Sequence, residues 1–162
     1  VVSRFPKVKF LFASPNPTEE TIKIEKELRQ YTIDLGIEKY VMFLGDVANM
    51  REVIRSIDIC LFPVSTLNNK MDIPITLLES MAYAKPVIVT DIKPLDEIML
   101  DDVGFKVPVG NIEALTKNIL ELLGSNTMRF EKGFKGRMII EKHFNMSKIA
   151  KDYENLYSEM IG

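Results

Sequence analysis

The chain has 162 residues, 46% hydrophobic and 27% charged, a composition typical of one globular domain with a full core. Its 21 Lys and Arg against 23 Asp and Glu give a net charge of −2, which argues against binding to duplex nucleic acid. The single cysteine, Cys60, excludes an intrachain disulfide and a cysteine zinc cluster, so a reducing, cytoplasmic compartment is expected. No apolar run reaches the ~18 residues that a membrane span needs.

The first half of the chain alternates between short apolar runs and helical patterns. Asn16, Pro17 and Glu19 provide the cap, first position and third position of a helix that is predicted to end at Gly36. A shorter helix is predicted to begin at Asn49. Three apolar runs closed by turn residues are predicted as strands, at residues 8–13, 40–44 and 58–63.

The second half continues the same alternation. Strands are predicted at 86–90 and 103–107. Helices are predicted at 94–100, 110–124, 127–142 and 146–160. Strands and helices that alternate with short connections predict an α/β fold of one domain, residues 1–162, with a Rossmann-like doubly wound parallel sheet covered by helices on both faces.

The stretch 71–90 holds the strongest candidate for a binding site. Pro74 suits the first position of a helix, so the next amides, those of Ile75 and Thr76, would be unpaired donors at the positive end of the helix dipole. Such an end is a ready site for phosphate. Glu79 follows about one turn later and could accept hydrogen bonds from the vicinal hydroxyls of a ribose. The alternative is a helix that packs by its apolar residues and leaves Glu79 in water.

The remaining reactive side chains indicate no catalytic residue. Cys60 lies in an apolar run, which favours a buried, inert thiol over a nucleophile. His143 is the single histidine, and a solvated position at a helix end is favoured over a role as catalytic base. The polar loop 64–70 follows the third strand, where open α/β sheets bind ligands. No general base or metal cluster is visible in the sequence.

Several sequence blocks occur in a fixed order along most of the chain. They are VMFLG at 41–45, SIDI at 56–59, LLESMAYAKPVIVTD at 77–91, EI at 97–98, GFKVP at 104–108 and NIEAL at 111–115. This order resembles the C-terminal, donor-binding domain of GT-B glycosyltransferases, specifically glycosyltransferase family 4 (group 1). The resemblance runs from about Val8 to Tyr157.

The resemblance implies an enzyme of glycan biosynthesis that transfers a sugar from a nucleotide-sugar, such as a UDP- or GDP-sugar, to a sugar or lipid-linked acceptor. It implies retention at the anomeric carbon, no bound metal and no cofactor besides the donor. Glu79 would hold the donor ribose, and the amides of Ile75 and Thr76 would meet the diphosphate. A loop beside the nucleobase would be formed by Gly45, Asp46 and Val47.

Three positions depart from the family pattern. Met71 stands at the first glutamate of the family's Glu-x7-Glu motif, and its thioether cannot accept hydrogen bonds from sugar hydroxyls. Asp72 either takes over that work through a one-residue shift or caps the following helix, where it would compete with phosphate. Ala84 replaces the usual glycine, so a left-handed helix end there would cost about 1 kcal/mol. The loop 64–70 is also longer than in many members.

The resemblance covers only the donor half of a two-domain enzyme. Nothing before Val8 supplies the acceptor-binding domain or the family's Gly-Arg turn and Lys. We therefore expect a separated domain that binds a nucleotide-sugar but does not turn it over alone, from a protein peripheral to the membrane face. The helix within 144–162 would cross toward the missing domain. Without that domain we expect self-association through its apolar face, formed by Tyr153, Leu156, Tyr157 and Met160.

Two other functions remain open from the sequence. A non-catalytic nucleotide-binding or regulatory α/β module is favoured somewhat by Met71. A sugar-nucleotide epimerase fragment shares the architecture but would need acid and base groups that the sequence does not place. The nucleobase, the sugar, the acceptor and the linkage do not follow from these residues.

Overall fold

A computed structural model describes residues 1–13, 18–45, 47–67, 73–100 and 102–161. The chain divides into two compact units, Val1–Met50 and Arg51–Gly162, and each is described by itself. The strand pairings among the described residues are all parallel. The strands alternate with helices along the chain, which confirms the predicted α/β class.

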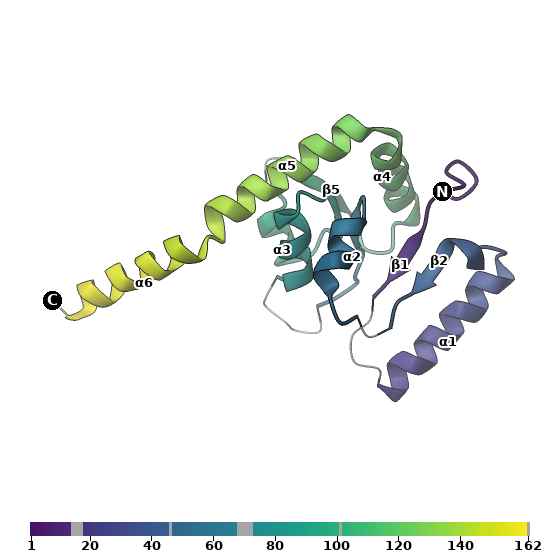
Figure 1. Cartoon of the computed structure of the whole chain (residues 1–162), viewed down its shortest axis with the longest axis horizontal. Helices are drawn as coiled ribbons and strands as arrows, with labels where there is room; N and C mark the ends of the chain where they lie inside the picture. Colours follow the sequence, from purple (N-terminus) through teal and green to yellow (C-terminus); the bar gives the residue numbers. More distant parts are fainter. Residues whose placement is uncertain (14–17, 46, 68–72, 101, 162) are drawn as a thin grey trace. The chain divides into compact units, whose positions relative to one another are not determined.

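The first unit is a strand, a helix and a second strand. Its elements are β1 (Phe10–Phe12), α1 (Glu19–Asp34), the 3-10 helix η1 (Glu38–Tyr40) and β2 (Val41–Phe43). β1 pairs with β2 in a register that places Phe10 opposite Val41 (Figure 1). The Phe12 and Phe43 rings stack with 5.2 Å between centroids, and the Arg29 guanidinium lies 4.5 Å from the Phe43 ring centroid.

The start of α1 differs from the predicted one. Thr18 is the N-cap, so Glu19 occupies the first helical position and not the third; Asn16 and Pro17 lie outside the described residues. The Thr18 hydroxyl accepts a hydrogen bond from the Thr21 amide (3.1 Å), and the Thr18 amide donates to the Thr21 hydroxyl (2.7 Å). This reciprocal pair satisfies two amides that the helix itself leaves unpaired, which explains why the helix begins here.

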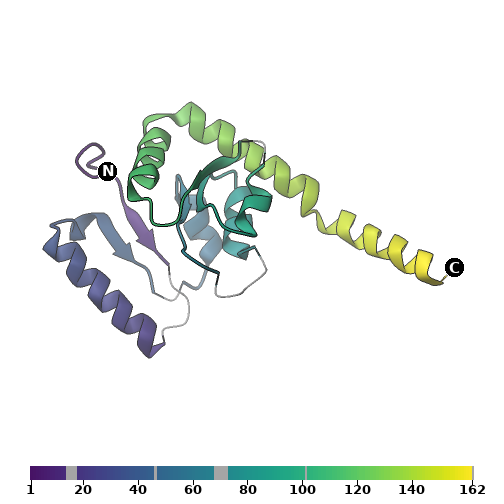
Figure 2. The same cartoon turned by 180° about the vertical axis from the view of Figure 1, so that it is seen from behind.

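The second unit contains a three-stranded sheet with the order β3-β4-β5. Its elements are α2 (Met50–Ser56), β3 (Cys60–Phe62), α3 (Ile75–Ala82), β4 (Val87–Thr90), the 3-10 helix η2 (Leu95–Ile98), β5 (Gly104–Val107), α4 (Ile112–Gly124), α5 (Asn126–His143) and α6 (Met146–Ile161). Figure 2 shows α4 beside the sheet, followed directly by α5. Each predicted strand and helix is therefore present, although 94–100 contains a 3-10 helix.

The core of this unit forms around β4, whose four residues are all buried. Val87 and Val89 pack with Leu77 and Met81 of α3. The same cluster is completed by Leu95, Ile98, Val103 and Ile139. Burial on both faces agrees with the continuously apolar sequence of a central parallel strand. α3 is thereby fixed to the sheet by its apolar side.

The end of α3 is held by a left-handed residue and a close helix crossing. Ala84 has φ 54°, so the helix does end in a left-handed residue at the position where the family usually has glycine. Its amide donates to the Met81 carbonyl (2.9 Å), and the Lys85 amide donates to the Ser80 carbonyl (2.9 Å). α5 passes so close that a Cβ built on Gly133 would lie 1.9 Å from the Ala84 carbonyl oxygen.

Replacing Ala84 by glycine is expected to raise the free energy of unfolding by about 0.5–1 kcal/mol, because glycine adopts a positive φ without steric cost. Urea denaturation measures the change. Ala82→Gly is the matched control: the same substitution at the last residue of α3 should lower stability, since glycine weakens a helix. A loss of stability in both variants would contradict the account of Ala84.

A buried lysine joins α5 to the turn before β5. The Lys132 side chain is 7% exposed, forms an ion pair with Asp102, and lies with its ammonium 4.4 Å from the Phe105 ring centroid. Lys135 lies 3.3 Å from the second Asp102 oxygen. The hydrogen bond from Lys132, assisted by Lys135, lowers the pKa of Asp102 below its ordinary value. The carboxylate form is thus favoured in the folded state.

Asp102→Asn is expected to lower stability at pH 7, by less than the roughly 3–5 kcal/mol of a fully buried pair, because the Asp102 side chain is 64% exposed and solvent screens the interaction. A pKa lowered by folding contributes stability above the unfolded pKa, and that contribution is lost as the pH falls through the folded pKa. The difference in the free energy of unfolding between Asp102→Asn and the wild type should therefore shrink as the pH falls below about 4. Urea denaturation at several pH values measures this difference. Asp152→Asn, at an exposed position, is the control and should have the stability of the wild type at each pH.

Candidate functional site

The candidate site lies where the chain leaves β3 and enters α3. Because α3 connects two parallel neighbouring strands, its first turn lies at the carboxyl edge of the sheet. Pro74 is the N-cap of α3, with ψ 128°, and not its first helical residue as predicted. Its extended ψ places it outside the helix, while its carbonyl already accepts from the amides of Leu77 (3.0 Å) and Leu78 (3.3 Å).

The one-residue shift leaves the predicted amides unpaired. Within the described part of the chain, the backbone amides of Ile75 and Thr76 donate no hydrogen bond. The Ile75 side chain is 73% exposed, and Thr76 is exposed as well. Unpaired amides at the positive end of the α3 dipole can donate hydrogen bonds to an anion that approaches from solvent.

Glu79 lies one turn further along α3 and is half-buried. Its carboxylate forms no ion pair or hydrogen bond with any residue that the structure describes. Ser80, the next residue, is buried, and its hydroxyl donates to the Thr76 carbonyl (2.7 Å), which restrains the first turn of α3. The structure thus brings Ile75, Thr76 and Glu79 together on two turns of one helix, with the Glu79 oxygens available as acceptors.

The other predicted site residues lie in the Val1–Met50 unit or outside the described residues. Gly45, with φ 60°, and Val47 belong to the Val1–Met50 unit, whereas α3 belongs to the second unit. Asp46, Met71 and Asp72 lie outside the described residues.

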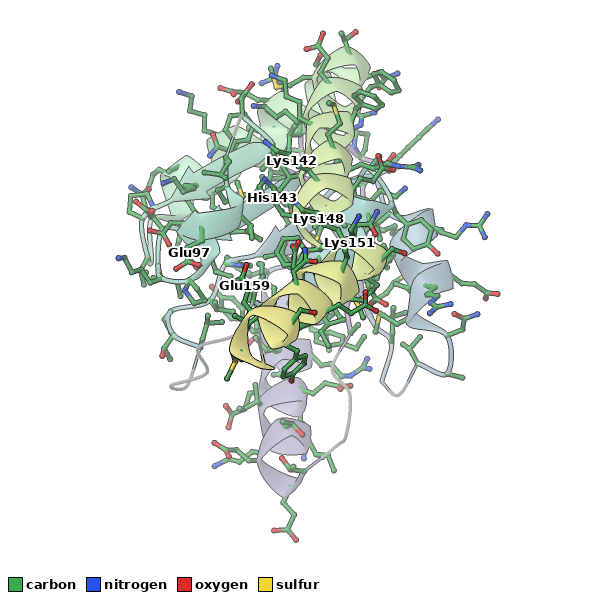
Figure 3. The ribbon with its side chains drawn as sticks, turned by 90° about the vertical axis from the view of Figure 1, so that its left-hand side faces the viewer. Glu97, Lys142, His143, Lys148, Lys151 and Glu159 are labelled. Atoms are coloured by element: carbon green, nitrogen blue, oxygen red, sulfur yellow. The ribbon has the colours of Figure 1, made fainter. Side chains whose placement is uncertain are left out.

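Cys60 is half-buried, where full burial was predicted, and His143 is exposed as predicted. Burial raises the pKa of the Cys60 thiol, and its hydrogen bond with Ser80 only partly opposes this, so the thiol stays protonated. His143 is exposed at the end of α5 beside Lys142, and Figure 3 shows it with Lys148 and Lys151 of α6. Among the described residues, no three His, Cys, Asp or Glu side chains gather as metal ligands.

Two hydroxyl residues near this site are missed by sequence reasoning. Thr90 ends β4, and its hydroxyl donates to the Val64 carbonyl (2.5 Å); Ser80 restrains Thr76. Both are buried. The available signal is position: Ser80 follows Leu77 by three residues on α3, and Thr90 directly follows the apolar run at 87–89, so each is a polar residue next to the core that needs a hydrogen-bond partner.

The family model of glycosyl transferases group 1 matches residues 1–125, about three quarters of the chain. The chain belongs to this family. The family resemblance inferred from the sequence is therefore confirmed. Within the described residues of this glycosyltransferase domain, no helix is long and apolar enough to cross a membrane.

Two related proteins show how much of a longer glycosyltransferase this chain matches. N-acetyl-alpha-D-glucosaminyl L-malate synthase of Bacillus anthracis is 28% identical over 133 residues, which are 82% of this chain and 34% of the relative. The capsular polysaccharide biosynthesis glycosyltransferase CapM of Staphylococcus aureus is 27% identical over 85 residues, 52% of this chain and 22% of that protein. The chain thus spans about a third or less of these relatives.

Solved structures confirm the fold as the C-terminal half of a GT-B glycosyltransferase. The C-terminal domain of a glycosyl transferase group 1 family protein, LpcC, from Francisella tularensis has a TM-score of 0.76 at 21% identity, over 90% of this chain and 74% of that one. HepE of Anabaena in complex with UDP has a TM-score of 0.84 at 20% identity, over 95% of this chain and 42% of that one.

Proposed function

We propose that this glycosyltransferase domain binds a nucleotide-sugar donor at the first turn of α3, and that the longer protein transfers the sugar to an acceptor. The observation that carries the proposal is the pair of unpaired amides of Ile75 and Thr76 at the carboxyl edge of a parallel sheet. Both can donate to diphosphate oxygens, and the α3 dipole favours the negative charge that these oxygens carry.

Glu79 completes the donor site in this proposal. Its carboxylate has no described partner, so it can accept hydrogen bonds from both ribose hydroxyls. Pro74 leaves the amides free because it has no side-chain group to cap them. The loop of Gly45, Asp46 and Val47 contacts the nucleobase through its main chain.

A UDP-sugar is the first donor to test. Structures of HepE of Anabaena, to which the fold is similar, are complexes with UDP, with UDP and glucose, and with UDP-glucose. We propose transfer with retention and without a bound metal, as the family resemblance implies. From the single cysteine and the same resemblance, we place the longer protein in the cytoplasm, peripheral to the membrane face.

The chain alone is expected to bind a donor without transferring its sugar, because it spans 34% of the synthase relative. Isothermal titration with UDP-glucose, UDP, GDP-glucose and GDP measures binding, and release of nucleotide from UDP-glucose with candidate acceptors measures transfer. We expect tighter binding of one nucleotide-sugar than of its bare nucleotide, and no transfer. Absence of binding to all four ligands, or transfer by the chain alone, would contradict the proposal.

The same titration distinguishes the transferase from a second candidate function. Met71 cannot accept hydrogen bonds from sugar hydroxyls, which favours a nucleotide-binding or regulatory module without catalysis. Such a module would bind UDP or GDP as tightly as the matching sugar nucleotide. Discrimination in favour of the sugar nucleotide would exclude it.

We further propose that α6 docks on the acceptor-binding domain of the longer protein. None of its described side chains is buried. Its apolar residues recur three and four positions apart, so they share one exposed face. They are Met146, Ile149, Tyr153, Leu156, Tyr157 and Met160. An amphipathic helix with an open apolar face requires a partner surface.

Without the acceptor-binding domain, this face is expected to cause self-association of the chain as the concentration rises. Sedimentation velocity at several concentrations measures it. Leu156→Glu should abolish the association, whereas Asn155→Glu, one residue away and off the apolar face, should leave it unchanged. A wild-type chain that stays monomeric at every concentration would contradict the docking face.

A further inference from the structure

The first turn of α3 does not by itself balance the charge of a diphosphate. A helix end carries about half an elementary charge, whereas each phosphate group of a diphosphate carries at least one full negative charge. The chain has a net charge of −2, so the molecule as a whole does not attract an anion. A cationic side chain near the amides of Ile75 and Thr76 would supply the missing attraction.

Lys93 is a cationic side chain at the same edge of the sheet. It follows β4 by three residues, and the carboxyl end of β4 lies beside that of β3, from which the chain leads to α3. Its side chain is exposed and forms no ion pair with any residue that the structure describes. Lys106, near the end of β5, is instead paired with Asp91 (3.4 Å). Lys93 therefore carries a charge that no described carboxylate neutralises.

Packing holds the loop of Lys93 and the start of α3 on one core. Leu95 of η2 and Leu77 of the first turn of α3 are both fully buried in the hydrophobic cluster around β4. Ile92 and Ile73, a few residues earlier in each stretch, pack against the same cluster. Lys93 and the two unpaired amides each lie between two such anchors, so both stretches are held against one cluster. The flexible four-carbon stem of lysine lets the ammonium reach toward the amides.

We propose that Lys93 binds the diphosphate of the donor together with the amides of Ile75 and Thr76, which rests on the donor site proposed above. The Lys93 ammonium donates hydrogen bonds to the phosphate oxygens and offsets their charge, while the amides, fixed in the helix, determine where these oxygens lie. Two carboxylates follow Lys93 in the sequence, Asp96 and Glu97, and neither is within ion-pair distance of it. The ammonium is thus available to the ligand.

The test measures the affinity of the 162-residue chain for UDP and for uridine by isothermal titration, with thermal unfolding in parallel. We expect Lys93→Gln to weaken UDP binding about tenfold, since a charge-assisted hydrogen bond to phosphate is lost, and to leave uridine binding and the melting temperature unchanged. Lys93→Arg keeps the charge and should bind UDP within about threefold of the wild type. Lys148→Gln is the matched control, because it removes the same charge from an exposed lysine of α6; it should bind UDP like the wild type.

Salt gives a readout that a merely structural role would not change. Raising the NaCl concentration should weaken UDP binding less in Lys93→Gln than in the wild type, because screening acts on a charge contact that the variant has already lost. An identical salt dependence in the two proteins would contradict the contact between Lys93 and the diphosphate.

The outcomes distinguish this inference from the function on which it rests. Wild-type affinity for UDP in Lys93→Gln, an equal loss in Lys148→Gln, or equally weak binding in Lys93→Gln and Lys93→Arg would overturn the role of Lys93 and leave the donor site intact. A wild-type chain that binds UDP no more tightly than uridine would overturn the diphosphate contact itself, and the role of Lys93 with it.

Discussion

Gly133→Ala is expected to lower the free energy of unfolding by about 3 kcal/mol, at the upper end of what overpacking usually causes. A Cβ at this position would lie 1.9 Å from the carbonyl oxygen of Ala84 and 2.7 Å from its carbonyl carbon. These are backbone atoms in a left-handed turn that is fixed by two hydrogen bonds, so they cannot yield as the end of a side chain would. α5 must instead move away from α3 and open the core.

Gly136→Ala is the matched control, three residues along the same helix. The atoms nearest to its Cβ would be side-chain atoms of Met81, at 3.7 Å or more, which is an ordinary contact. Since alanine favours a helix over glycine, this variant should be neutral or more stable by up to about 1 kcal/mol. Urea denaturation of the two variants measures the contrast. Equal stability of Gly133→Ala and Gly136→Ala would contradict the close crossing of α5 over Ala84.

Glu79→Gln is expected to weaken binding of the nucleotide-sugar about tenfold to a hundredfold. In the proposed site the carboxylate accepts hydrogen bonds from ribose hydroxyls, and a bond to a charged group contributes roughly 1.5–3 kcal/mol. The amide of glutamine keeps the size of the side chain but loses the charge and one acceptor oxygen. Because Glu79 has no described partner in the fold, the stability of the chain should not change.

The control for Glu79 is Glu113→Gln, which changes an exposed glutamate in the first turn of α4. It removes the same charge from the chain, so it corrects for a general electrostatic effect on an anionic ligand. Isothermal titration of UDP-glucose against both variants gives the comparison. Equal affinity in the two variants would remove Glu79 from the donor site.

Local signals in the sequence predicted most of the fold. β4 is apolar over residues 87–89 because all four residues of the strand are buried. The cost of a left-handed end at Ala84 was predicted from the sequence, and the structure has that end. The predicted start of α1 was wrong, because Asn16, Pro17 and Glu19 fit a capping pattern as well as Thr18 does. The reciprocal bond between Thr18 and Thr21 decides between them.

Contacts between distant residues could not be predicted in this way. Asp102 and Lys132 are thirty residues apart, and Gly133 meets Ala84 only because α5 crosses the end of α3. The bond from Thr90 to Val64 likewise depends on the neighbouring strands. Helix patterns and turn residues describe a single element, whereas these contacts arise from packing between elements.

The sequence could place the part of the candidate site that lies on one helix, while the role of that part in donor binding stays a prediction. Ile75, Thr76 and Glu79 follow from the start of α3 and its periodicity, and the shift of the helix start past Pro74 leaves both amides unpaired. The part that needs a second unit, the loop at Gly45 and Val47, stays a prediction. The contact of the donor sugar at Asp72 stays a prediction as well.

The most direct test of the donor site follows the backbone amide signals of Ile75 and Thr76 by NMR while UDP is added to the ¹⁵N-labelled chain. If diphosphate oxygens accept from these amides, both signals should shift downfield with UDP and remain in place with uridine, which has no phosphate. Saturation of the chain with UDP while both signals stay unmoved would contradict the account.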